Sequence, residues 1–62
     1  MKVRDLISVL EADGWFVIRT RGSHRQFRSL RKAGTVTVSG KPGTDVPPGT
    51  LHNVLKQAGL RR

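Results

Sequence analysis

The stretch WFVIRTRGSHRQFRS, residues 15–29, holds two strand-like segments joined by a glycine and a serine. The first segment is rich in aromatic and β-branched residues, which favour a pleated strand. Gly22 and Ser23 tolerate the dihedral angles of a turn. The residues after this turn alternate around Phe27, and TVTVS at 35–39 alternates in the same way after a connection short enough for a hairpin. These patterns predict three consecutive antiparallel strands.

The segments on both sides of these strands have helical periodicity. The apolar positions of the first are Val3, Leu6, Ile7 and Leu10, and those of the second are Leu51, Val54, Leu55 and Ala58. Each set follows the spacing of one helical face. Gly14 suits the left-handed end of the first helix, while Pro48 suits the first turn of the second and Gly59 its end. The prolines and glycines of residues 40–50 predict a loop before the second helix.

The predicted order is helix, three strands, helix, which is an α+β fold. Two amphipathic helices and a three-stranded sheet all need one face covered, so both helices should pack on the same side of the sheet. Alternation places Arg25 on the covered face with Phe27. It places His24, Gln26 and Arg28 on the opposite face. We therefore expect His24 to be exposed or half-exposed, provided that no bulge near the turn shifts the alternation.

Composition predicts one small cytoplasmic domain. The chain has 62 residues and no cysteine, so its thin core must form without disulfides or thiolate metal ligands. No apolar run approaches the roughly 18 residues of a membrane-spanning helix. Charged residues at positions 4, 5 and 11 interrupt the N-terminal segment, where a signal peptide would be apolar.

The net charge of +8 favours a polyanionic partner such as nucleic acid, an anionic membrane or an acidic protein. Much of the charge falls in one short span, at Arg19, Arg21, Arg25, Arg28, Arg31 and Lys32. A membrane-binding segment would carry its basic residues along one face of an amphipathic helix. Because this span is predicted to form strands, the membrane is the least favoured partner.

Three stretches of the chain together resemble the HicA toxins, small mRNA-cleaving ribonucleases of prokaryotic toxin–antitoxin pairs. They are DLISVLEADGW at 5–15, RTRGSHRQF at 19–27 and PGTLHNVLKQAGL at 48–60. The resemblance implies a single HicA-like domain over residues 1–62 with a fold like that of double-stranded-RNA-binding domains. It also implies that His24 is catalytic, that cleavage of mRNA inhibits translation, and that the partner is a HicB antitoxin, which we expect to be acidic and to cover His24.

The chemistry of RNA cleavage suits these residues. RNA carries its own nucleophile, the 2′-hydroxyl, so the enzyme need only orient it, move a proton and stabilise phosphoryl charge. Histidine exchanges protons near neutral pH, and arginine offers a planar fork of donors to phosphate. We expect His24 to be the general base or acid of a transesterification. The candidate phosphate-binding residues are Arg19, Arg21, Ser23, Arg25 and Arg28.

A metal or other cofactor is not expected. The carboxylates Asp5, Glu11, Asp13 and Asp45 are scattered and show no ligand spacing with either histidine. The substrate is expected to be single-stranded, since PPGTLHN at 47–53 lacks the lysine cluster with which duplex-binding domains bridge phosphates.

Two other functions stay open: a non-catalytic RNA- or DNA-binding module, and a domain whose basic face binds an acidic protein.

Three further residue assignments are structural. His52 is expected to be a solvated helix residue outside the apolar stripe. Trp15 is expected to be a partly buried packing residue rather than to stack on a base. Arg61 and Arg62 are expected to form a solvated tail.

Overall fold

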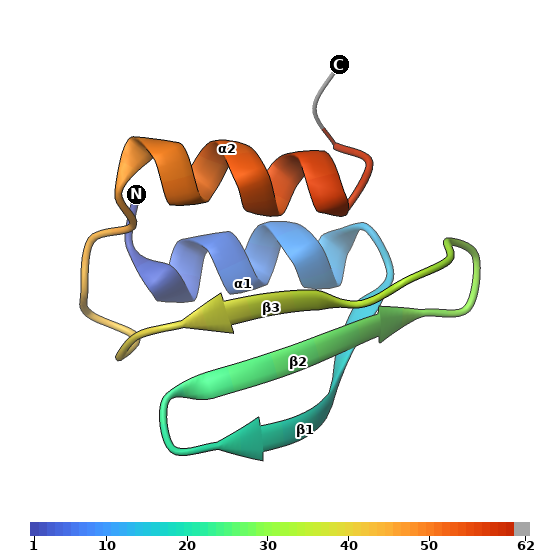
Figure 1. The fold of residues 1–62 in the computed structure, drawn as a ribbon, viewed down its shortest axis with the longest axis horizontal. Coiled ribbons are helices and arrows are strands. Elements are labelled where there is room, and N and C mark those ends of the chain that lie inside the picture. Colours follow the sequence, from blue (N-terminus) through green and yellow to red (C-terminus); the bar gives the residue numbers. More distant parts are fainter. Residues whose placement is uncertain (61–62) are drawn as a thin grey trace.

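The computed structural model describes residues 1–60; the predicted tail, Arg61 and Arg62, lies outside them. The elements are α1 (Val3–Ala12), β1 (Trp15–Arg21), β2 (His24–Ser29), β3 (Val36–Ser39) and α2 (Pro48–Gln57) (Figure 1). This is the predicted α+β order, which double-stranded-RNA-binding domains share, and the strand bounds differ from the prediction only at β3, which starts one residue later. Pro48 begins α2, which confirms its predicted place in the first turn, and the loop before the helix therefore ends at Pro47 rather than at residue 50.

The three strands form one antiparallel sheet in the order β1-β2-β3. Both helices lie on the same side of this sheet and run in the same direction (Figure 1). We call the sheet face that packs against the helices the inner face and the opposite one the outer face. The prediction that both helices cover one face is confirmed, and the outer face is left uncovered within residues 1–60.

One apolar core joins the helices to the inner face. It consists of Val3, Leu6, Leu10, Trp15, Phe27, Val36, Val38, Val46, Val54 and Ala58. Phe27 and Trp15 are its largest side chains, and Trp15, at only 2% exposed, is a packing residue as predicted but is buried more deeply than expected. Val46 was not predicted as a core residue, since it lies in the loop between β3 and α2 and belongs to no periodic pattern.

A bulge interrupts the pairing of β1 with β2. Val17 pairs with Phe27 and Arg19 with Gln26, so that Ile18 is an extra residue without a partner across the ladder. Directly paired residues share a face of the sheet, so the bulge reverses the alternation of β1 from Arg19 onward. The turn itself contains no such shift, because Arg21 pairs directly with His24.

The loop between β3 and α2 is bonded to the start of α1. The backbone carbonyl groups of Thr44 and Pro42 accept hydrogen bonds from the amides of Val3 and Arg4, at 2.9 and 3.1 Å. These amides are among the donors that the first turn of a helix leaves unpaired. The loop therefore replaces the side-chain cap that Lys2, the N-cap residue, does not provide.

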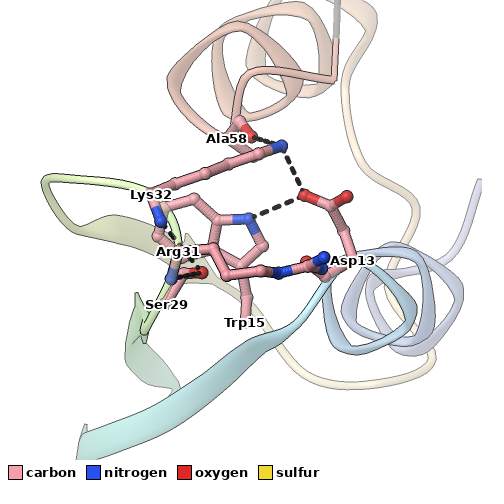
Figure 2. Close-up of polar contacts among 6 residues, drawn as sticks. All are labelled: Asp13, Trp15, Ser29, Arg31, Lys32 and Ala58. Atoms are coloured by element: carbon pink, nitrogen blue, oxygen red, sulfur yellow. Dashed lines mark hydrogen bonds and ion pairs between the residues drawn. The ribbon is translucent and has the colours of Figure 1, made fainter.

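Asp13 joins the ends of both helices to the sheet (Figure 2). Its Oδ2 accepts hydrogen bonds from Lys32 Nζ at 2.6 Å and from Trp15 Nε1 at 3.2 Å. Lys32 Nζ also donates to the carbonyl oxygen of Ala58, at the C-terminus of α2, where a cation is favourable. The hydrogen bond from Lys32 lowers the pKa of Asp13 below its ordinary value, and the charges of Lys32 and Arg31 add to this effect.

Candidate functional site

The outer face of the sheet carries the predicted catalytic histidine among arginines. The pairing register places eight side chains on it: Phe16, Arg19, Arg21, His24, Gln26, Arg28, Thr37 and Ser39. Phe27, on the opposite face, is fully buried, so the predicted alternation of β2 is confirmed. His24 is exposed, as predicted.

An open pocket of about 350 Å³ lies at one end of this face, beside the β1–β2 turn. Its lining residues are Arg19, Arg21, His24, Arg25, Gln26 and Thr37. The strand pairs Arg21 with His24 and Arg19 with Gln26 form the part contributed by β1 and β2. Thr37 is the partner of Gln26 on β3. The pocket is therefore rich in cationic donors, with one imidazole and two uncharged polar side chains among them.

The β1–β2 turn holds His24 at the start of β2. Gly22 has a φ of +59°, in the left-handed region that other residues rarely adopt. Beyond the turn, the Nδ1 atom of His24 lies 3.0 Å from the hydroxyl oxygen of Ser39, its partner on β3. Two neighbouring strands therefore fix the position of this histidine, one through the turn and one through a side-chain contact.

Arg25 combines a structural contact with a position at the pocket. It pairs with the buried Val38, which places it on the inner face, and it is half-buried. Its Nη1 donates a hydrogen bond of 3.2 Å to the carbonyl oxygen of Gly40, just after β3. Arg25 thus holds the end of β3 against β2 and offers its remaining donors at the rim of the pocket.

Two of the predicted phosphate-binding residues do not line the pocket. Arg28 lies on the outer face, but it pairs with Phe16, nearer the other end of β1. Ser23 is half-buried in the turn, where its carbonyl oxygen accepts a hydrogen bond from Gly40. His52 is exposed on α2 and also lies outside the pocket, which confirms that it is a solvated helix residue.

Sequence reasoning missed three polar residues of the site: Gln26, Thr37 and Ser39. The alternation of β2 and of β3 indicates which of their residues share a face, but it does not say which residues lie opposite one another. The register supplies that information, since it pairs Gln26 with Thr37 and His24 with Ser39. A loop between β2 and β3 with the length of a standard hairpin turn would have set the register of the two strands, and so would have indicated these pairs from the sequence.

The described residues also limit other kinds of site. Among residues 1–60, no three histidine, aspartate or glutamate side chains gather into a group suited to a metal ion. No helix in this part of the chain has the length and apolar character needed to cross a bilayer.

Comparison with known proteins agrees with the resemblance that the sequence shows. A family model described as the HicA toxin of bacterial toxin-antitoxin matches residues 3–60. No curated protein matches the chain. The matched region contains both helices, all three strands and every residue that lines the pocket. The chain therefore belongs to the HicA family, the toxins of bacterial toxin–antitoxin pairs.

Proposed function

We propose that this toxin is an endoribonuclease that cleaves single-stranded mRNA without a metal ion and so inhibits translation. The observation that carries the proposal is the exposed imidazole of His24 in a pocket that three arginines also line. An RNA strand in this pocket would bring its own 2′-hydroxyl nucleophile beside a group able to exchange protons. Because its substrate is mRNA, the enzyme would act in the cytoplasm.

The histidine and the arginines of the pocket have specific roles in this proposal. His24 moves the proton of the 2′-hydroxyl or of the leaving 5′-oxygen. Arg19 and Arg21 hold the scissile phosphate and stabilise the charge that develops on its oxygens. Arg25 contacts the same phosphate from the rim. Ser23 and Arg28, outside the pocket, would contact neighbouring phosphates of the strand.

The reaction is a transesterification. The 2′-oxygen attacks the adjacent phosphorus as its proton leaves, and the bond from phosphorus to the 5′-oxygen of the next nucleotide breaks. That 5′-oxygen takes a proton. The products are one RNA with a 2′,3′-cyclic phosphate end and one with a 5′-hydroxyl end. No oxidant, metal or further cofactor takes part.

The test compares the wild-type protein with His24→Ala and His52→Ala on a long mRNA in EDTA. His52→Ala is the matched control, since it removes the other histidine, which is exposed on α2 away from the pocket. We expect the wild type and His52→Ala to cleave equally. His24→Ala should bind RNA and leave it intact. A substrate with a single 2′-deoxynucleotide should resist cleavage at that position only.

Two results would contradict this proposal in different ways. Products with 3′-hydroxyl and 5′-phosphate ends would exclude attack by the 2′-hydroxyl. If no variant cleaves RNA and all bind it with a strong dependence on salt, the protein is a nucleic-acid-binding module. No affinity for RNA at any salt concentration would leave only the binding of an acidic protein.

The toxin family implies a cognate antitoxin, and we propose that it is of the HicB type with an acidic surface that covers His24. The net charge of +8 and the arginines of the pocket support this, because complementary charges speed encounter. Arg21→Glu should weaken both antitoxin and RNA binding. Lys56→Glu, a charge reversal of equal size on α2, should leave antitoxin binding unchanged. Equal effects of the two reversals would contradict an antitoxin seated on the pocket.

A further inference from the structure

The contact between His24 and Ser39 suggests how the imidazole is prepared for proton transfer. We propose that Ser39 is a positioning residue: its hydroxyl oxygen accepts a hydrogen bond from Nδ1–H of His24 and leaves Nε2 free to take a proton from RNA. The two atoms lie 3.0 Å apart, between side chains that are direct partners on β2 and β3. This inference rests on the proposed ribonuclease function, to which it adds a tautomer and the residue that selects it.

Of the two cross-strand partners of His24, only one offers an acceptor for the Nδ1 hydrogen. On one side His24 pairs with Arg21, and on the other it pairs with Ser39. A guanidinium group has donors but no acceptor, whereas a serine hydroxyl has two acceptor lone pairs. Among these two cross-strand partners, therefore, only Ser39 is able to hold the ring through Nδ1–H.

If Ser39 accepts the hydrogen bond from Nδ1–H, this bond is kept throughout the proton transfer. A hydroxyl that donated to Nδ1 would require the hydrogen of the neutral ring to be on Nε2, where it would block proton uptake. With Ser39 as acceptor, Nδ1 keeps its hydrogen in both the neutral ring and the cation. The bond then persists while Nε2 gains a proton, and it strengthens as the ring becomes charged.

The backbone around Ser39 is held from two directions. The next residue, Gly40, donates its amide hydrogen to the carbonyl oxygen of Ser23 at 3.2 Å. The carbonyl oxygen of Gly40 accepts the hydrogen bond of 3.2 Å from Arg25 Nη1. Ser39 is thus fixed relative to the turn and to β2, the two segments that position His24. A hydroxyl on such a support orients the ring at little entropic cost.

Both side chains are exposed, which sets the expected size of the effect. Water competes for the Nδ1 hydrogen in the absence of the hydroxyl, so the loss of Ser39 should weaken catalysis without abolishing it. A single hydrogen bond of this kind corresponds to a reduction of about threefold to tenfold in kcat. KM should stay unchanged, since Ser39 does not line the pocket.

The test reads the tautomer of His24 directly, in protein labelled with ¹⁵N in its histidines. Long-range ¹H–¹⁵N spectra, recorded at a pH at which the imidazole ring is neutral, distinguish the ring nitrogen that carries hydrogen from the one that does not. We expect wild-type His24 to carry hydrogen on Nδ1. Ser39→Ala should return it to the Nε2–H form that an unconstrained histidine favours, and Ser39→Thr should restore the wild-type pattern. His52, exposed on α2, is an internal reference in every spectrum.

Thr35→Val is the matched control, because it removes a hydroxyl just before β3, four residues from Ser39. It should change neither the tautomer nor kcat. The inference is overturned if wild-type His24 carries hydrogen on Nε2, or if Ser39→Ala leaves the tautomer and kcat unchanged. The spectra need no RNA, so they decide the role of Ser39 even if the wild type fails to cleave and the ribonuclease proposal falls.

Discussion

Arg21 lies directly opposite His24 in the antiparallel pairing of β1 with β2, and the bulge at Ile18 is the reason that Arg21 faces outward with His24. Strict alternation from the buried Trp15 would put Arg19 and Arg21 on the inner face, toward the helices. The extra residue reverses the alternation and puts both arginines beside the imidazole. Bulges next to functional sites often re-aim side chains in this way.

The position of Arg21 predicts a larger role in RNA binding than that of Arg28. Both are exposed on the outer face, but only Arg21 lines the pocket. Arg21→Ala should weaken RNA affinity roughly threefold to tenfold and lower the slope of log affinity against log salt by about 0.7, the value for one single-strand phosphate contact. Arg28→Ala should cause a smaller loss. Fluorescence anisotropy over a salt series measures both, and equal losses would contradict a pocket-centred phosphate site.

The contacts of Asp13 with Lys32 and Trp15 predict lower stability in acid. The hydrogen bond from Lys32 lowers the pKa of Asp13 in the folded protein, so the unfolded chain binds its proton more readily. The stabilising effect is complete above the ordinary carboxyl range, about pH 4, and is lost as pH falls through the lowered pKa. Thermal unfolding from neutral pH to acid should show this loss, and Asp13→Asn should flatten the profile.

Asp45 requires a separate control in that experiment. The hydrogen bond from Lys2 and its charge lower the pKa of Asp45 as well. Asp45→Asn should therefore remove a second part of the acid dependence, leaving the part due to Asp13. A profile that Asp13→Asn does not alter would mean that the contacts of the Asp13 carboxylate, drawn in Figure 2, contribute nothing to the acid dependence of stability.

Two glycines predict opposite responses to alanine. Gly14 has a φ of +96°, and an added Cβ would lie 3.1 Å from Arg31 Nη2. Gly14→Ala should destabilise the fold by about 1–2 kcal/mol, the cost of the left-handed conformation. Gly49 lies in α2 with open space around it, so Gly49→Ala should stabilise the fold by up to about 1 kcal/mol. Urea denaturation measures both changes, and a similar loss in both variants would contradict this difference in backbone conformation.

Trp15 provides an optical test of which side of the sheet binds RNA. It is the one tryptophan of the chain and is buried in the core with the inner-face residues. RNA bound on the outer face should leave its fluorescence unchanged, whereas unfolding in urea should shift the emission to longer wavelength. Strong quenching by RNA in the folded protein would instead indicate base stacking on Trp15.

The sequence by itself determined the elements of this fold and their order. The apolar periods of both helices, the alternation around Phe27 and the glycine at position 14 are local signals. Each depends on the chain within a few residues, so each was readable without the structure. The exposure of His24 followed from the same alternation. The clustering of basic residues near it was visible in the sequence as well.

Only the tertiary structure decided which residues lie next to one another. The bulge at Ile18, the pairing of His24 with Ser39 and the burial of Val46 depend on how separate segments meet. Pairing between strands also depends on the geometry of the connecting turns and on hydrogen bonding across the ladder, and neither leaves a periodic trace in the sequence. The physical reason is that periodicity fixes the face on which a side chain lies, while register fixes its neighbours.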